Sequence, residues 1–298
     1  MIGVPEIICH QVEKRYRNKR VLHSLTCSIN KGKLSGLIGR NGAGKSTLLK
    51  LLAGHLKPTN GEITVFGECP FNNLKTASNI MFVEEGMTFP PLFTVLDIFK
   101  MAKDFYPNWQ HELAKRLLDY ANIPTNAFHH NLSKGQKSTF NLIYGLASRC
   151  TISLLDEPMN GMDESIRTDM YRAILKEYIA YPRTIIISSH HLNEMEHLLE
   201  EIILIDNGQI KLHASLDDVQ QMLVRLRGDI NLIRKLTSDM EVFFEKEDLF
   251  HYEVVVERNK IDEKLLQTMN ILVQPVTASE VCKFMTSKGK GGIDDVFK

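Results

Sequence analysis

The sequence predicts an α/β protein with antiparallel strands at its N-terminus, a helical subdomain and a small C-terminal α+β appendage. Several short apolar runs read as buried strands, and helical patterns separate them. These runs lie at residues 34–38, 79–83, 151–155 and 184–187. The sequence pattern changes beyond about Arg225, where short strand and helix patterns follow. We therefore predict a main domain over residues 1–222, with a helical subdomain at about 86–150, and an accessory domain over 223–298.

The composition is that of an ordinary soluble globular protein, with 43% hydrophobic and 24% charged residues. Lys plus Arg and Asp plus Glu both number 36, so no overall charge favours nucleic acid as a partner. No apolar run approaches the roughly 20 residues that span a bilayer, and residues 1–10 show no signal-peptide pattern. The five cysteines lack C-x-x-C spacing, which argues against a zinc site or a disulfide framework and favours a reducing cytoplasm.

Residues 6–12 and 22–29 predict the antiparallel strands, and a basic connector joins them. A basic run can bind nucleic acid, but the zero net charge favours a solvated hairpin. Tyr16 lies inside this run. It either packs against the hairpin or offers a flat surface on which an adenine ring can stack.

The most informative segment is the glycine-rich loop Gly39-Arg40-Asn41-Gly42-Ala43-Gly44-Lys45-Ser46-Thr47, which follows one strand and opens a helical pattern at 48–52. This is the order of a P-loop, so the core is predicted to be a P-loop NTPase. Gly39, Gly42 and Gly44 let successive N–H groups point at phosphate oxygens, and the helix start adds its positive dipole end. Lys45 supplies a charge for the β- and γ-phosphates, and the Ser46 hydroxyl can ligate Mg²⁺.

Two later segments carry further candidate residues. Helical patterns fill residues 95–122 and 137–148, and Ser133 precedes the second of them. Ser133 is either its N-cap or, with the Gly135 amide, part of a second anion site. The strand at 151–155 ends in Asp156 and Glu157.

The carboxylates at this strand end are either solvated or catalytic. In a P-loop protein, Asp156 would hold Mg²⁺, and Glu157 would orient and deprotonate the attacking water. His190 follows the strand at 184–187, where a nucleotide would lie in this fold, and we interpret it as a γ-phosphate sensor. Its neighbour His191 is expected at the surface, because no further metal ligand has a supporting spacing.

The rest of the chain shows no catalytic constellation. A hairpin with an Asp-Asn-Gly turn and a capped helix end the main domain, and two strands, a helix and a basic, glycine-rich loop follow in the appendage. The predicted ranges are 201–205 with 209–212 for the hairpin, 215–222 for the first helix, 252–256 and 271–275 for the strands, 279–285 for the last helix and 288–292 for the loop.

In this order, GRNGAGKST, LSKGQ, LLDEP, NGMD and SSH resemble the ATP-binding subunit of ABC transporters over about residues 5–220. The resemblance implies an adenine-stacking role for Tyr16 and a family signature at Leu132-Ser133-Lys134-Gly135-Gln136. It implies that Asn41 and Thr47 belong to the nucleotide-binding loop, and that Ser133, Gly135 and Gln136 face a nucleotide held by a second copy. In this family two such domains enclose two ATP molecules and drive a membrane partner.

Three positions depart from the family pattern. Glu85 replaces the glutamine of the coupling loop, where a carboxylate could still hold Mg²⁺-bound water. Lys134 replaces the first glycine of the signature, and Met159 replaces a common threonine. The proposed catalytic residues Lys45, Glu157 and His190 are all present, so we expect an active Mg²⁺-dependent ATPase.

The segment Phe105-Tyr106-Pro107-Asn108-Trp109, together with LSKGQ, is similar to bacterial exporter ATPases of the bacitracin-resistance and GntR-operon kind, some of whose relatives export phenol-soluble modulins. We therefore expect a cytoplasmic subunit, peripheral on the inner face of the membrane, that works as a homodimer or heterodimer to export a drug-like or amphipathic peptide substrate. The alternative is a non-transport ABC ATPase of translation or DNA repair. Such proteins usually carry two ATPase domains or a long coiled-coil insertion, and neither pattern occurs here. A P-loop kinase or GTPase would leave LSKGQ without a role.

Overall fold

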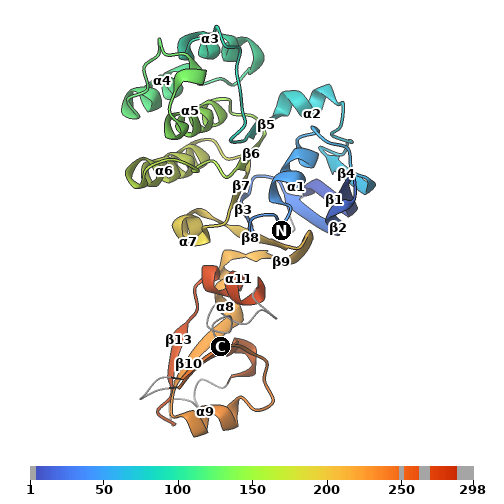
Figure 1. The fold of residues 1–298 in the computed structure, drawn as a ribbon, viewed down its shortest axis with the longest axis vertical. Coiled ribbons are helices and arrows are strands. Elements are labelled where there is room, and N and C mark those ends of the chain that lie inside the picture. The colour runs from blue at the N-terminus through green and yellow to red at the C-terminus, as the bar shows by residue number, and fades with distance from the viewer. Residues whose placement is uncertain (1–4, 248–251, 262–268, 287–298) are drawn as a thin grey trace. The chain divides into compact units, whose positions relative to one another are not determined.

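The computed structural model of the chain describes residues 5–247, 252–261 and 269–286 (Figure 1). The chain divides into two units, Met1–His213 and Ala214–Lys298. The division falls before helix α8 (Leu216–Met222), whereas the sequence places it after residue 222. The reason is that α8 packs against strand β10 (Leu223–Gly228) and helix α11 (Ala278–Thr286), which belong to the second unit.

A six-stranded sheet forms the core of the first unit. Its order is β5 (Ile80–Val83), β6 (Ile152–Asp156), β7 (Thr184–Ser189), β3 (Leu34–Ile38), β8 (Glu201–Asp206) and β9 (Gln209–Ser215). The neighbours from β5 to β8 are parallel. Strands β3, β6 and β7 are buried at every position, which explains why they appear in the sequence as continuous apolar runs.

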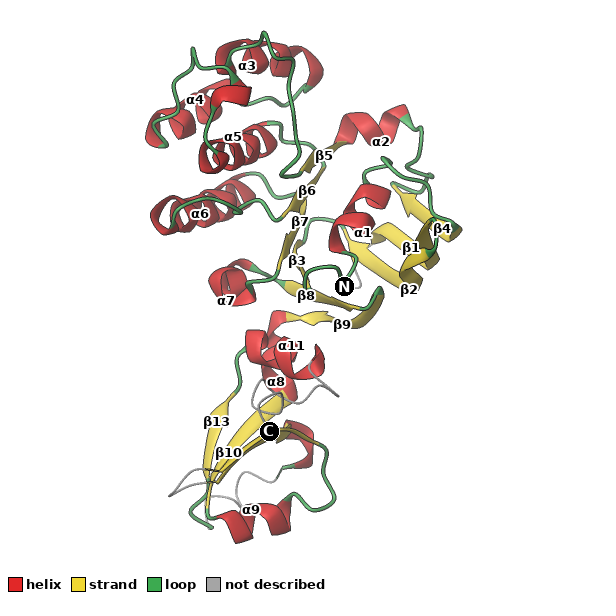
Figure 2. Cartoon of the chain, in the orientation of Figure 1, coloured by secondary structure: helices red, strands yellow, loops and turns green. Residues whose placement is uncertain are grey.

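A three-stranded antiparallel sheet lies on the other side of helix α1 (Lys45–Leu52), in the order β2 (Lys19–Asn30), β1 (Pro5–Tyr16) and β4 (Asn60–Val65) (Figure 2). The hairpin is longer than predicted, because the basic connector itself pairs: Arg15 lies opposite Arg20, and the Arg20 guanidinium pairs with Glu13. Helix α1 contacts strands of both sheets and buries four leucines between them. Burying each of these side chains contributes about 1.5–3 kcal/mol.

The helical subdomain follows β5, and Figure 1 shows it gathered beyond that end of the sheet. Its helices are α3 (Val95–Phe105), α4 (His111–Tyr120), the short 3-10 helix η1 (His129–Asn131) and α5 (Lys134–Ala147). Phe99 stacks on Phe140 and meets the edge of Trp109, so the only tryptophan of the chain is a core residue. The remaining helices of this unit are α2 (Leu74–Asn79), α6 (Glu164–Ala180), α7 (Leu192–Met195) and η2 (Glu196–Leu198).

The second unit contains an antiparallel four-stranded sheet in the order β11 (Val242–Glu247), β12 (Tyr252–Glu257), β10 and β13 (Leu272–Pro275). Helix α9 (Ile230–Leu236) packs on β10 and β12, and η3 (Arg258–Lys260) follows β12. The sequence patterns do not indicate β10, α9 or β11, and the predicted loop at 288–292 lies outside the described residues. Within the described ranges, no helix is both long and apolar enough to cross a membrane.

Candidate functional site

The carboxyl ends of four neighbouring parallel strands bring the predicted site residues to one edge of the sheet. The glycine loop follows β3, Asp156 is the last residue of β6, His190 follows β7, and Glu85 lies just beyond β5. Ligands of open α/β sheets bind outside this edge. The sheet order therefore explains why segments far apart in sequence form one site.

The glycine loop has the backbone that its sequence predicts. A Cβ atom on Gly39 would lie 2.3 Å from the Ile205 carbonyl oxygen, and Gly44 caps α1 with φ of 111°. Both positions therefore require glycine. The loop forms a hollow of about 220 Å³. It is lined by Arg40, Asn41, Gly42, Gly44, Lys45, Ser46, Thr47 and Glu157, and by two residues of β2 that the sequence does not assign to the site, Lys19 and Val21.

Lys45, Glu157 and His190 form a connected cluster. The Lys45 Nζ atom lies 3.1 Å from Glu157 Oε1 and donates a hydrogen bond of 2.7 Å to the Gly39 carbonyl oxygen. His190 Nδ1 lies 3.0 and 3.1 Å from the two carboxylate oxygens of Glu157. Lys45 is only 6% exposed, so its charge needs these partners. The glutamate thus lies between the predicted phosphate-binding lysine and the predicted sensor histidine.

Asp156 and Ser46 supply the donors that Mg²⁺ prefers, a carboxylate and a hydroxyl. Asp156 is buried, and one of its oxygens accepts a hydrogen bond of 2.6 Å from the Ser188 hydroxyl, which fixes the carboxylate at the end of β6. Ser188 also accepts a hydrogen bond from the Glu157 amide. In the described part of the chain, no group of three or more His, Cys, Asp or Glu side chains could hold a metal by itself. The donor set therefore fits an ion whose remaining ligands are phosphate and water oxygens.

Glu85, the third predicted metal residue, has a cationic partner. Its carboxylate lies 2.7 Å from Lys134 Nζ, and the stem of Lys134 lies over Gly161. The two main departures from the family pattern thus contact each other. A role for Glu85 in the metal shell stays a prediction, and it requires this ion pair to open.

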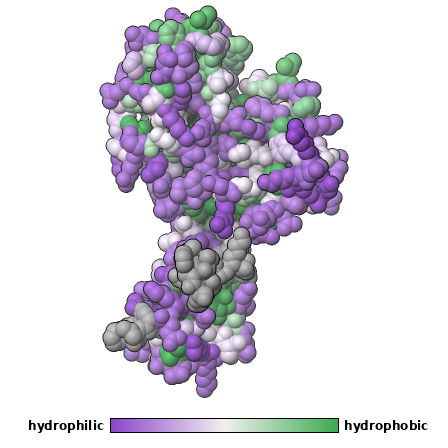
Figure 3. All heavy atoms as spheres, viewed as in Figure 1, coloured by the Kyte–Doolittle hydropathy of each residue, from purple (hydrophilic) through white to green (hydrophobic). Residues whose placement is uncertain are grey.

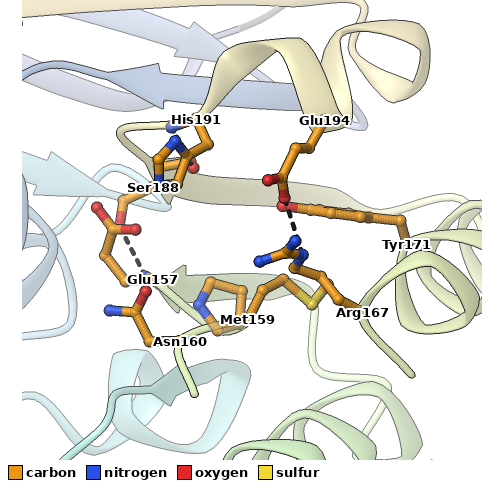
Figure 4. Close-up of a pocket in the computed structure, with 10 residues that line it drawn as sticks. Glu157, Met159, Asn160, Arg167, Tyr171, Ser188, His191 and Glu194 are labelled. Carbon is orange, nitrogen blue, oxygen red and sulfur yellow. Dashed lines mark hydrogen bonds and ion pairs between the residues drawn. The ribbon is translucent and has the colours of Figure 1, made fainter. Parts of the chain in front are cut away.

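A small pocket of about 20 Å³ lies behind Glu157, enough space for one water molecule (Figure 4). Figure 4 shows Arg167 of α6 reaching Glu194 of α7, with an N–O distance of 3.1 Å, beside Tyr171. Burial raises the pKa of the Tyr171 hydroxyl, which keeps it neutral. His191 is exposed, as the sequence predicts, and its side chain also lines this pocket.

Tyr16 and the signature residues lie outside the lining of the glycine-loop hollow. Tyr16 is 43% exposed at the end of β1, with Lys14 Nζ 5.4 Å from its ring centre. Ser133 and Gln136 cap α5 reciprocally: Ser133 Oγ accepts from the Gln136 amide, and Gln136 Oε1 accepts from the Ser133 amide. Ser133 is nevertheless exposed, and a hydroxyl that accepts can still donate. The capping role and the predicted anion-binding role are therefore compatible.

Comparison with known proteins decides the family. A family model described as "ABC transporter" matches residues 22–160. The chain is 30% identical to the aliphatic sulfonates import ATP-binding protein SsuB 3 of Pseudomonas syringae pv. tomato, over 72% of this chain and 78% of that protein. It is 32% identical to the Nod factor export ATP-binding protein I of Burkholderia lata, over 69% of each. The chain belongs to the ABC transporter family.

The fold agrees with this assignment. A solved dimeric ATP-binding cassette, in a post-hydrolysis state with ADP and phosphate, superposes with a TM-score of 0.62 at 22% identity, over 70% of this chain and 98% of that one. This ABC protein is therefore an ATP-binding, ATPase-type subunit with the P-loop α/β fold predicted from its sequence. Its family resemblance is confirmed, whereas the exporter subtype stays a prediction, because the similar proteins include both an importer and an exporter subunit.

Proposed function

We propose that this ABC subunit hydrolyses Mg²⁺-bound ATP as a dimer and thereby drives export through a separate integral-membrane subunit, on the inner face of the cell membrane. The cluster of Lys45, Glu157 and His190 carries the proposal. It places a candidate general base within hydrogen-bonding distance of both a phosphate-binding cation and a histidine. Ser46 and Asp156 would hold Mg²⁺, which would neutralise charge on the β- and γ-phosphates.

The position of the signature residues supports a dimer. Ser133 and Gly135 form a helix N-terminus suited to an anion, but neither lines the hollow at the glycine loop of its own chain. In the proposed dimer, Ser133, Gly135 and Gln136 of one copy face the nucleotide held by the other, and Tyr16 stacks on the adenine.

Complementation between two inactive variants tests this arrangement. Lys45→Ala disables the glycine loop, and Ser133→Arg disables the signature. If sites are shared between copies, mixing the two variants restores one intact site in each mixed dimer. Random association makes about half of the dimers mixed, so phosphate release should recover to about a quarter of that of the unmodified chain at the same protein concentration. Ser165→Arg, at another exposed serine, is the matched control and should remain active. No recovery on mixing, although mixed dimers form, would show that each copy works alone.

The helical subdomain offers a surface for the membrane subunit. Leu92 is 87% exposed and Leu96 38% exposed, both in the segment that follows Glu85, and Figure 3 shows hydrophobic side chains over this subdomain. We expect Leu92→Asp to leave basal ATP hydrolysis unchanged and to abolish stimulation by the membrane subunit in proteoliposomes. Ile179→Asp, at another exposed apolar residue, is the control. ATP-dependent uptake of an amphipathic peptide into inside-out vesicles would support export, and ATP-dependent loss from them would support import.

A further inference from the structure

Two cysteines that are far apart in sequence lie directly opposite each other in the N-terminal hairpin. Cys9 of β1 pairs with Cys27 of β2 in the antiparallel register. Side-chain hydrogen bonding between the two thiols raises the pKa of Cys9 and lowers that of Cys27. Directly opposed residues of antiparallel strands have Cα atoms about 4.5–5.5 Å apart, which lies within the range that a disulfide spans. The hairpin therefore brings the two sulfur atoms into bonding reach without a change of fold.

An acid–base group lies next to this pair. His213 of β9 lies 3.5 Å from the carboxylate of Glu201, which also accepts a hydrogen bond of 2.6 Å from Ser35. The hydrogen bond to Glu201 raises the pKa of His213. The hydrogen bond with Cys9 lowers the pKa of Cys27, and the charge of His213 adds to this against the effect of burial. Hydrogen bonding and burial raise the pKa of Cys9, so Cys27 is the more acidic of the two thiols.

Accessibility separates the two cysteines in the same way. Cys27 is half-buried, whereas Cys9 is only 1% exposed and belongs to the hydrophobic core. A small oxidant thus meets the Cys27 sulfur first, and that sulfur has the greater thiolate character. Neither cysteine lines the nucleotide hollow, so this chemistry is separate from ATP hydrolysis.

We propose that Cys27 and Cys9 form a dithiol site that reacts with hydroperoxides, with Cys27 as the attacking sulfur and Cys9 as the resolving one. The Cys27 thiolate attacks one peroxide oxygen, and the O–O bond breaks. Cys27 becomes a sulfenic acid, while the leaving oxygen takes a proton from His213 and departs as water or an alcohol. The Cys9 sulfur then attacks Cys27: an S–S bond forms, the S–O bond breaks, and the hydroxide leaves with the Cys9 proton as water. Two thiols have then given two electrons to one peroxide, and a small-molecule thiol can reverse the reaction.

Peroxide titration of the reduced full-length chain tests the proposal, with free thiols blocked afterwards and peptides mapped by mass spectrometry. Cys69→Ser serves as the background, because Cys69 is exposed and would compete for oxidant. We expect a Cys9–Cys27 disulfide that a small thiol reverses. In Cys9→Ser the sulfenic acid at Cys27 should persist and react with dimedone. His213→Gln should slow oxidation about three- to tenfold, since nucleophilicity partly offsets the loss of thiolate.

The mapping in the unmodified chain keeps the proposal testable even where a variant folds poorly. Oxidation of Cys69 while Cys9 and Cys27 both stay reduced would overturn it. So would a disulfide that joins Cys27 to a different cysteine, or sulfenic acid formation at Cys9 in Cys27→Ser at the rate seen for Cys27.

Discussion

Replacing Glu157 by glutamine should have two opposite effects, one on turnover and one on nucleotide binding. The glutamine keeps the size of the side chain and loses its charge and basicity. Loss of a general base slows a reaction by about 10²–10⁴, which corresponds to roughly 3–5 kcal/mol in the barrier. We therefore expect phosphate release to fall by at least a hundredfold while ATP still binds.

The effect on binding follows from the ion pair with Lys45. At 3.1 Å and an effective dielectric constant of about 20, the attraction is roughly 5 kcal/mol before the cost of desolvation. A charge-assisted hydrogen bond has a net value of only about 1.5–3 kcal/mol. Because ATP must take Lys45 from Glu157, removing the negative charge should make ATP bind more tightly by about 1–2 kcal/mol, or roughly five- to thirtyfold.

Phosphate-release kinetics and fluorescent-nucleotide titration measure the two effects. Glu164→Gln is the matched control, since Glu164 is an exposed carboxylate at the start of α6, and neither quantity should change. Turnover within about threefold of the unmodified chain would refute the role of Glu157 as the base. Weaker rather than tighter ATP binding would refute the competition between phosphate and Glu157 for Lys45.

Three further predictions concern stability. Burial lowers the pKa of His129, so the unfolded histidine binds its proton at a higher pH than the folded one. The contribution of His129 to the free energy of unfolding should therefore be complete above about pH 6.5 and fall below it. Urea unfolding followed against pH measures this, and His129→Asn should flatten the dependence. Gly208→Ala places a Cβ 2.2 Å from a backbone oxygen, at a φ of 74°. Gly67→Ala, at a φ of 78° with open space around it, is the control and should cost roughly 1–2 kcal/mol of stability. Thermal unfolding should show a larger loss of stability for Gly208→Ala. Both side chains of the Lys134–Glu85 ion pair are more than half exposed. A double-mutant cycle of Lys134→Ala and Glu85→Gln should therefore give a coupling free energy below about 1 kcal/mol that weakens with salt. A larger, salt-independent coupling would contradict this.

The fold was predictable where burial leaves a local pattern. Strands β3, β6 and β7 are buried on both faces and appear as unbroken apolar runs. Strand β11 has no apolar pattern to detect, because most of its residues are exposed. In β10 the buried residues Leu223, Val224 and Leu226 are interrupted by Arg225, so they form neither a continuous nor an alternating run. The boundary between the units depends on what α8 packs against, which is a tertiary contact and has no sequence signal of its own.

The same distinction holds for the site. The glycine loop, Asp156-Glu157 and His190 could be located because each belongs to a short motif next to a strand. Lys19 could not be assigned to the hollow, since only the approach of β2 to the glycine loop brings it there. Its positive charge alone offered a weak signal for a phosphate-binding site. The contacts of Glu85 with Lys134 and of Cys9 with Cys27 likewise exist only after folding.

The ion pair between Lys45 and Glu157 explains how ATP binding to this ABC subunit could make the Glu157 carboxylate available as a general base. Without a phosphate, the nearly buried lysine charge is compensated by Glu157 and by the Gly39 carbonyl oxygen. A γ-phosphate carries more negative charge than one carboxylate, so in the proposed function it displaces Glu157 from Lys45. The freed carboxylate keeps its contact with His190 and becomes available to a water molecule. In the proposed function, Lys45 thus holds the base until the substrate replaces it, and hydrolysis then requires only Ser133 of a second copy.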